Sequence, residues 1–143
     1  MDPTIRDAAH ADAEAIAGLL TQLGYPSEPA AVEARLDRLR IVGDRVVVAE
    51  VDGRVAGLAQ LQVSPAIERD RPAAKLGALV VDEAQRGQGI GRTLVEAIEA
   101  EARLRGCELL FPTTAERRDD AHSFYERVGF EYTGRRYART LSE

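Results

Sequence analysis

Three glycines stand at alternate positions between a short apolar run and an amphipathic stretch, and this pattern constrains the fold most. The apolar run covers residues 78–81, and the glycines are Gly87, Gly89 and Gly91. After them, apolar side chains recur at helical spacing, so the pattern predicts a buried strand, a tight turn and a helix. Glycine tolerates positive φ and lets a ligand come close to the backbone. The turn is therefore the first place to look for a ligand.

The same turn predicts an anion site. The first N–H groups of a helix have no partners within the helix, and the helix dipole adds positive potential there. Arg86 and Arg92 flank the glycines and offer charge-assisted hydrogen bonds to a pyrophosphate. A tight turn that binds nothing is the alternative, because short glycine patterns also occur by chance. The spacing fits neither a P-loop nor the dinucleotide motif Gly-x-Gly-x-x-Gly.

The rest of the chain alternates between strand and helix periods. Asp12 is the expected N-cap of the first helix, and Asp52-Gly53 signals a hairpin. We expect strands over 4–7, 45–51, 54–63, 74–81 and 107–111, a strand pair over 131–141, and helices over 12–23, 29–40, 90–106 and 119–128. This order predicts an α/β or α+β fold on a mixed sheet.

Composition narrows the class of protein. A chain of 143 residues suits one domain. A net charge of −5 and a pI near 5.2 argue against nucleic acid as a partner, and no apolar run approaches the ~20 residues that span a membrane. One cysteine and two histidines predict neither a disulfide nor a metal centre. With no signal sequence visible, we expect a cytoplasmic protein.

Two motifs resemble a known family. Residues 85–92 look like the acetyl-CoA pyrophosphate loop of the GNAT superfamily of N-acetyltransferases, whose pattern Arg/Gln-x-x-Gly-x-Gly/Ala is met by Arg86, Gly89 and Gly91. Residues 121–130 are similar to its closing signature Ala-x-x-Phe-Tyr-x-x-x-Gly-Phe. The order of elements agrees over almost the whole chain. The resemblance implies one acetyltransferase domain over residues 1–143.

The implied GNAT-like architecture is a twisted, mixed and mostly antiparallel sheet. It would have roughly six or seven strands and about four flanking helices. A V-shaped split would separate its two central parallel strands. That split is where the resemblance implies that the pantetheine arm lies.

The resemblance implies acetyl-CoA as co-substrate and no metal. Pantetheine would pair with main-chain groups of Leu79, Val80 and Val81. The N–H of Val81 would polarise the thioester carbonyl, as an oxyanion-hole donor does. Phe124 would border the sulfur, with core packing as the alternative. The pyrophosphate would lie on Arg86, Gly87, Gln88, Gly89, Ile90, Gly91 and Arg92.

Tyr125 is the implied general acid. Ala121, Phe124, Tyr125 and Val128 share one helix face, a spacing that by itself favours core packing. Many members of the superfamily use this tyrosine to protonate the leaving thiolate, and the pKa of a phenol, ~10, lies close to that of a thiol. His122 is expected at the surface.

The implied reaction is direct acetyl transfer to a primary amine of a small molecule or peptide in a ternary complex. A non-catalytic acetyl-CoA sensor and a structural domain with an empty turn are the alternatives. Glu50, Asp82 and Glu83 are candidate general bases. The chain departs from the family pattern at Glu83, where proline is usual, and at Arg118, where asparagine is frequent. Homodimers are common in the family, and no sequence feature here decides that question.

Overall fold

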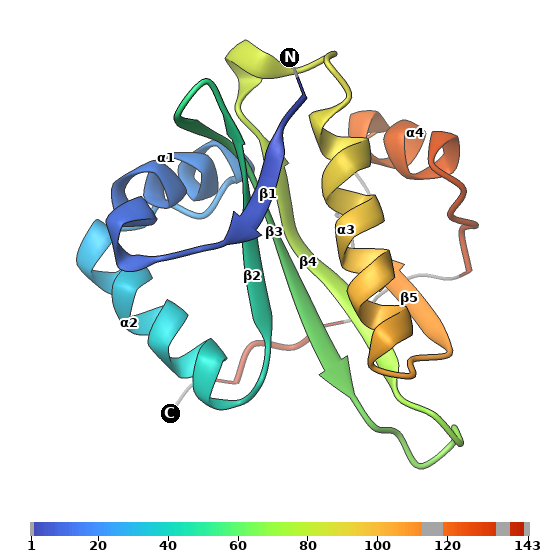
Figure 1. Cartoon of the computed structure of the whole chain (residues 1–143). Helices are drawn as coiled ribbons and strands as arrows, with labels where there is room; N and C mark the ends of the chain where they lie inside the picture. Colours follow the sequence, from blue (N-terminus) through green and yellow to red (C-terminus); the bar gives the residue numbers. More distant parts are fainter. Residues whose placement is uncertain (1, 113–118, 134–137, 142–143) are drawn as a thin grey trace. The chain divides into compact units, whose positions relative to one another are not determined.

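The structure is a computed structural model that describes residues 2–112, 119–133 and 138–141. It divides into two compact units, Met1–Pro112 and Thr113–Glu143, which are described one at a time. The first unit holds a five-stranded sheet in the order β1-β2-β3-β4-β5 (Figure 1). Its strands are β1 (Thr4–Asp7), β2 (Arg45–Val51), β3 (Arg54–Ser64), β4 (Ala73–Val81) and β5 (Leu109–Pro112).

The sheet is mixed, as the sequence predicts. The first four strands pair antiparallel, whereas β4 and β5 pair in parallel. The β2–β3 hairpin turns at Asp52 and Gly53, both with positive φ. The last strand begins at Leu109, two positions later than predicted, and Cys107 precedes it as a half-buried free thiol.

Helices cover both faces of this sheet. A 3-10 turn η1 (His10–Asp12) leads into α1 (Ala13–Leu23), and α2 (Pro29–Ile41) follows on the same face. The other face carries α3 (Ile90–Leu104), which runs along β3 and β4 (Figure 1). The crossover from β4 through α3 to β5 is the βαβ arrangement that parallel strands require.

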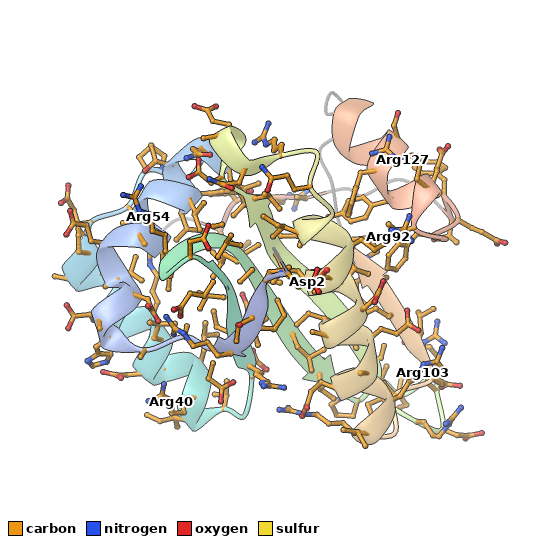
Figure 2. The ribbon with its side chains drawn as sticks, turned by 45° about the horizontal axis from the view of Figure 1, so that its top comes forward. Asp2, Arg40, Arg54, Arg92, Arg103 and Arg127 are labelled. Carbon is orange, nitrogen blue, oxygen red and sulfur yellow. The ribbon has the colours of Figure 1, made fainter. Side chains whose placement is uncertain are left out.

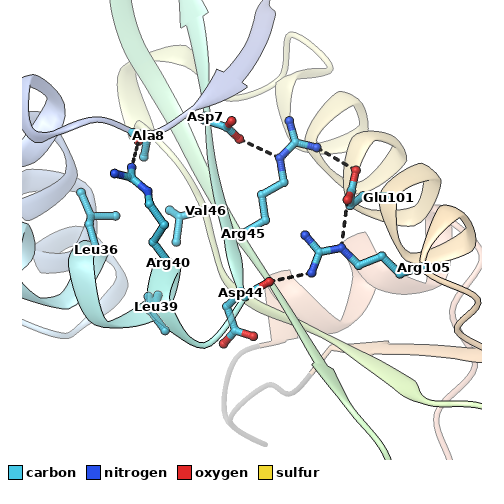
Figure 3. Close-up of a pocket in the computed structure, with 11 residues that line it drawn as sticks. Asp7, Ala8, Leu36, Leu39, Arg40, Asp44, Arg45, Val46, Glu101 and Arg105 are labelled. Carbon is cyan, nitrogen blue, oxygen red and sulfur yellow. Dashed lines mark hydrogen bonds and ion pairs between the residues drawn. The ribbon is translucent and has the colours of Figure 1, made fainter.

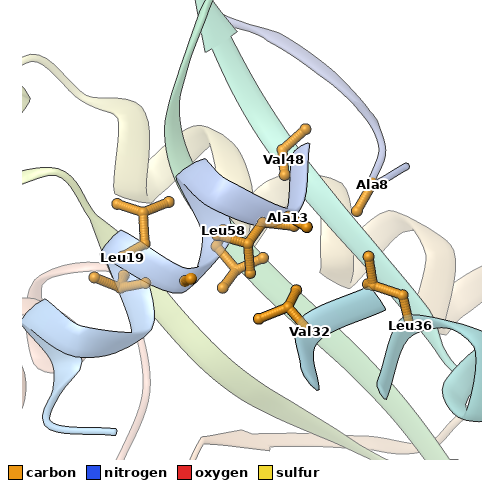
Figure 4. Close-up of a cluster of buried hydrophobic side chains, with 10 residues drawn as sticks. Ala8, Ala13, Leu19, Val32, Leu36, Val48 and Leu58 are labelled. Atoms are coloured by element: carbon orange, nitrogen blue, oxygen red, sulfur yellow. The ribbon is translucent and has the colours of Figure 1, made fainter. Parts of the chain in front are cut away.

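Apolar side chains fill the space between the sheet and the first two helices. Strand residues Val48, Leu58 and Val80 meet side chains of α1 and α2 there (Figure 4). The helical contribution is Ala13, Ile16, Ala17, Leu19, Val32 and Leu36. Because successive strand side chains alternate between faces, the neighbours of these residues point towards α3. The central strands β2, β3 and β4 are therefore covered on both faces.

The contact between α3 and β3 depends on a glycine. A Cβ atom built on Gly57 would lie 2.9 Å from Leu94 Cδ1 and 3.2 Å from Ile90 Cγ2. Those distances are below ordinary van der Waals contact. Gly57 thus lets the first turns of α3 approach the sheet closely, which places the start of α3 beside the end of β4.

Asp12 is the N-cap residue of α1, as predicted, but its side chain binds elsewhere. Its side chain does not cap α1; instead its Oδ2 accepts the Ala9 N–H at 2.8 Å, and η1 precedes the helix. Arg6 donates to both carboxylate oxygens of Asp12, at 2.8 and 2.9 Å, and to Glu50 Oε2 at 2.6 Å. The hydrogen bonds from Arg6 hold the pKa of Asp12 below its usual value. The predicted N-cap position is therefore confirmed, whereas the carboxylate is used by Arg6 and the Ala9 N–H and not by the first turn of α1.

The second unit contains α4 (Asp119–Arg127), and Gly129, two residues after the helix, has φ +100°. Tyr125 packs edge-to-face against Phe124 and Phe130, with ring centroids 5.6 and 5.7 Å apart. The Phe130 N–H donates to the Tyr125 carbonyl at 2.9 Å. In the predicted strand pair over 131–141, residues 131–133 and 138–141 carry no strand, and 134–137 lie outside the described residues.

Candidate functional site

The end of β4 contains a β-bulge. Its ladder with β3 pairs Val80 with Leu58 and Gly77 with Gln60, so β4 uses one residue more than β3 between these pairs. Within the bulge, Ala78 has φ +48°, a left-handed conformation that side chains rarely adopt. The Ala78 side chain packs against the core beneath α1 and α2. The bulge bends the last residues of β4 and changes the direction of their main-chain groups.

The main-chain N–H of Val81 points away from β3. Asp82 donates its N–H to the Ala56 carbonyl at 2.8 Å, and Val81 is in register with Gly57. In an antiparallel ladder this makes Val81 and Gly57 a non-hydrogen-bonded pair, whose N–H groups face outward. The Val81 N–H therefore lies on the β5 side of β4.

On that side, the described ladder is parallel. It runs from Ala73–Leu109 to Leu76–Pro112, the last described residue before a gap, whereas β4 continues to Val81. Over residues 2–112, no strand pairs with β4 beyond Leu76 on this edge. Within these residues, the edge of β4 from Gly77 to Val81 has no paired strand, which is compatible with the predicted split between parallel strands.

A short loop connects β4 to α3 and presents backbone donors. After η2 (Glu83–Gln85), Gly87 and Gly89 adopt φ of +84° and +82°. Gly89 is the N-cap of α3, and no side chain caps the helix there. Apart from the glycine itself and its chain neighbours, no described atom lies within 4 Å of a Cβ built on either position. The first N–H groups of α3, which have no acceptor within the helix, thus follow a loop with open space around its glycines, the arrangement that an anion needs.

The predicted loop residues divide by what they can offer. Gln88 and Arg92 are exposed, and Arg92 extends from the first turns of α3 (Figure 2). Arg86 is exposed as well, and its Nε donates to the Val81 carbonyl at 3.2 Å. Its remaining guanidinium donors are available for a phosphate. The Ile90 side chain is only 2% exposed and belongs to the core, so only its N–H can serve a ligand.

The strand residues also divide. The Val80 side chain lies in the core, and its carbonyl oxygen is 3.4 Å from the position of a Gly57 Cβ, on the β3 side. Its main chain therefore pairs with β3, unlike that of Val81. Leu79, inside the bulge, and Val81 are half-buried. Of the three predicted strand residues, Val81 has the geometry of an outward donor.

One bridging residue escaped sequence analysis. Gln22, near the end of α1, donates from Nε2 to Asp82 Oδ1 at 3.3 Å and accepts the Glu83 N–H at 3.0 Å. Asp82 Oδ1 also accepts the Ala84 N–H at 3.3 Å. A lone exposed glutamine carries no sequence signal for such a bridge. Of the candidate bases, Asp82 is thus engaged in the loop, Glu50 pairs with Arg6, and only the Glu83 side chain stays exposed without a hydrogen bond in the described part of the chain.

Comparison with known families decides the class of protein. Residues 13–130 match the sequence model of the acetyltransferase (GNAT) family. The chain belongs to this family. The predicted GNAT membership, and with it an acyltransferase, is confirmed at the level of the family.

Relatives with assigned names support the same class. The aminoalkylphosphonate N-acetyltransferase of Salmonella typhimurium (strain LT2) is 34% identical over 90 residues, which is 63% of this chain and 58% of that enzyme. The aminoglycoside N(6')-acetyltransferase type 1 of Stenotrophomonas maltophilia is 29% identical over 136 residues, 93% of this chain and 89% of that enzyme. The match thus spans less than two thirds of the Salmonella enzyme. Both relatives are N-acetyltransferases.

A solved structure confirms the GNAT fold. A transcriptional regulator from Bacillus halodurans C-125 superimposes with a TM-score of 0.87 at 26% identity, covering 97% of this chain and 99% of that one. The predicted α/β class with a mixed sheet is therefore confirmed. The five strands described here are fewer than predicted, since the closing pair is not among them.

The second GNAT motif lies in the second unit. Phe124 and Tyr125 are half-buried on α4. Their roles beside the sulfur and as general acid stay predictions. His122 belongs to the same helix, and Arg118 lies outside the described residues.

A hollow elsewhere in the first unit differs from the glycine loop in its charges. It measures about 650 Å³ and lies between the ends of β1, α2 and α3 (Figure 3). Arg45 bridges Asp7 at 2.7 Å and Glu101 at 3.1 Å, and Arg105 donates to Glu101 at 2.9 Å and to the Gly43 carbonyl at 2.6 Å. The hydrogen bond to Asp7 raises the pKa of Arg45. These charges pair with one another, so the hollow offers a ligand few unpaired groups.

Metal centres and membrane spans are both missing from the described part of the chain. Among residues whose placement is described, no group of three or more His, Cys, Asp or Glu side chains is arranged to hold a metal ion. In the same residues, no helix has both the length and the apolar character needed to cross a membrane.

Proposed function

We propose that this GNAT protein transfers the acetyl group of acetyl-CoA directly to a primary amine of a small molecule or peptide in a ternary complex. One observation carries the proposal: the outward N–H of Val81 lies one short loop away from an uncapped helix start with two positive-φ glycines. Acetyl-CoA carries both a thioester carbonyl and a diphosphate. The Val81 N–H can serve the carbonyl, and the N–H groups at the helix start can serve the diphosphate. The site fits coenzyme A because added Cβ atoms at Gly87 and Gly89 would project into the open space.

Each part of the site has a proposed task. The N–H groups at the start of α3, with Gly87, Gln88, Gly89 and Gly91, hold the diphosphate, and Arg86 and Arg92 neutralise its charge. Main-chain groups of Leu79 and Val81 hold the pantetheine arm. The sequence predicts the same role for Val80, although its main chain pairs with β3. The thioester supplies the activated acetyl group. The Val81 N–H stabilises the negative charge that develops on the carbonyl oxygen.

Proton transfers complete the reaction. The amine loses a proton on attack, and the leaving sulfur gains one. Tyr125 is the proposed donor to sulfur, and Phe124 is proposed to border it. Glu83 is the candidate base that keeps an exposed carboxylate, with water as the carrier of the proton. Glu50 and Asp82 would first have to leave their partners.

Charge and the relatives support the proposed class of acceptor. The chain carries a net charge of −5, which suits a cationic amine. The two named relatives act on an aminoalkylphosphonate and an aminoglycoside, both of which carry amines. We extend to this chain only the primary amine that these acceptors share. A cytoplasmic location and a homodimer are further expectations of the same proposal.

An amine panel tests the proposal. The protein is incubated with acetyl-CoA and polyamines, aminoglycosides, aminoalkylphosphonates, amino acids or peptides, and released thiol is measured. We expect at least one amine to raise thiol release above the background hydrolysis of acetyl-CoA. Acetylation of that amine is then verified by mass spectrometry. Binding of acetyl-CoA without transfer to any amine would contradict the enzyme.

A non-catalytic acetyl-CoA sensor is the second candidate. One observation favours it: the superimposed structure from Bacillus halodurans is described as a transcriptional regulator. In that case calorimetry would detect acetyl-CoA binding while the amine panel stays silent. If neither acetyl-CoA binding nor amine acetylation is detected, both candidate functions are wrong.

A further inference from the structure

The amide of Gln22 joins the end of α1 to the two residues that follow β4. Its Nε2 donates to Asp82 Oδ1 at 3.3 Å, and its Oε1 accepts the Glu83 N–H at 3.0 Å. The partners are 60 and 61 positions away in sequence. Gln22 therefore ties a helix on one face of the sheet to the segment that leads into α3 on the other.

The bridged segment lies between the two halves of the coenzyme site. Val81 precedes it and Arg86 follows it, and the Arg86 Nε returns to the Val81 carbonyl at 3.2 Å. Inside the segment, Asp82 is the N-cap of η2, and its Oδ1 also accepts the Ala84 N–H. The end of β4 and the segment that leads to the glycine loop are thus joined by these few bonds.

The bridge requires an amide. Asp82 presents a carboxylate acceptor, whereas Glu83 presents an N–H donor, so the side chain between them must donate and accept at once. Glutamine does both, glutamate cannot donate when ionised, and lysine cannot accept. The identity of residue 22 matters here, although its side chain is exposed.

We infer that Gln22 is a positioning residue for the coenzyme A site, acting through Asp82 and Glu83 on the Val81 N–H and the glycine loop. The inference rests on the proposed function, because the ligand it serves is the proposed one. Gln22 is assigned no contact with acetyl-CoA. Its effect should therefore appear in coenzyme affinity and turnover, and not in the KM for the amine.

The first experiment compares Gln22→Ala with Gln62→Ala. Gln62 is an exposed residue of β3, opposite Lys75 and outside the proposed site, and it undergoes the same change. We expect Gln22→Ala to weaken coenzyme A binding about tenfold by calorimetry, the scale of losing two partly exposed hydrogen bonds. The kcat should also fall, while the KM for the amine and the melting temperature stay close to those of Gln62→Ala.

The second experiment restores the bridge by exchanging the amide and the carboxylate between positions 22 and 82. Gln22→Glu places a second carboxylate beside Asp82 and should weaken coenzyme binding at least as much as Gln22→Ala. In the double variant Gln22→Glu/Asp82→Asn, the new amide at position 82 donates to the new carboxylate at position 22. That carboxylate still accepts the Glu83 N–H, while the amide oxygen accepts the Ala84 N–H. Affinity should return to within about threefold of wild type. Affinity is the deciding measurement because loss of a general base would not change it.

The outcomes separate the two claims. Wild-type protein that binds no coenzyme A would overturn the proposed function itself. Wild-type binding, with Gln22→Ala equal to Gln62→Ala, would overturn only the role of Gln22. So would a double variant no better than Gln22→Glu alone. An independent measurement is the exchange rate of the Glu83 amide hydrogen by NMR, which Gln22→Ala should raise and Gln62→Ala should not.

Discussion

The two ends of α3 differ in whether their polar groups have partners. At its start, Gly89 provides no side-chain cap, and the first N–H groups open onto space. At its other end, Glu101 and Arg105 join Arg45 and Asp7 in a chain of ion pairs beside the hollow (Figure 3). The hollow is the more conspicuous feature, yet its charges are already paired. Unpaired donors, and not volume, identify a site for an anionic ligand.

The largest expected effect comes from a matched pair of glycines at these two ends. Gly89→Glu should abolish coenzyme A binding, because the side chain would project a negative charge into the diphosphate site. Gly106→Glu places the same residue at a similar positive φ, +77° against +82°, beyond the other end of the helix. Both should lose about 1–2 kcal/mol of stability from the left-handed backbone. Calorimetry checks binding; equal affinities in the two variants would mean that the glycine loop does not hold the ligand.

Next in size is the separation of binding from chemistry. Tyr125→Phe removes the proposed acid while keeping the aromatic ring that packs against Phe124 and Phe130. Turnover should fall about 10- to 1000-fold with coenzyme affinity nearly unchanged. Steady-state kinetics with an active amine from the panel provides the measurement. Unaltered turnover would remove Tyr125 from the mechanism.

A smaller effect tests how the start of α3 is seated. Gly57→Ala places a Cβ 2.9 Å from Leu94, so the helix or strand must shift. We expect a loss of about 1–3 kcal/mol in the free energy of unfolding, together with weaker coenzyme binding. Gly77→Ala is the control, because its Cβ would meet Gln60 at 3.5 Å, an ordinary contact. Denaturant titration of both variants decides, and equal stabilities would show that the close approach is not needed.

The smallest effect belongs to the ion-paired end. Arg45→Gln breaks the exposed pair with Asp7 and the partly buried pair with Glu101, and it should cost about 0.2–1 kcal/mol per pair, less at high salt. Coenzyme binding should not change. Thermal unfolding at low and high salt measures the cost. A loss of coenzyme affinity in this variant would contradict the assignment of coenzyme binding to the start of α3 alone.

Much of the fold was predictable because it depends on local patterns. Val47 to Ala49 and Leu58 to Leu61 belong to β-branched or apolar runs next to an Asp-Gly turn, and their strands form as expected. The glycine loop was predictable for the same reason, since positive φ at Gly87 and Gly89 needs that residue type. The role of Asp12 was not, because its partner Arg6 reaches it only when β1 and η1 pack together.

The sequence alone therefore determined the positions of most strands and helices, the glycine loop and the family motifs. Each of these depends on residues that are close together in the chain. Tertiary structure decided the bulge at Ala78, the outward direction of the Val81 N–H and the bridge from Gln22. These features depend on strand register and on contacts across some 60 positions. Such contacts form only when the sheet and its helices pack, because no local preference favours a left-handed alanine or links a helix end to a distant loop.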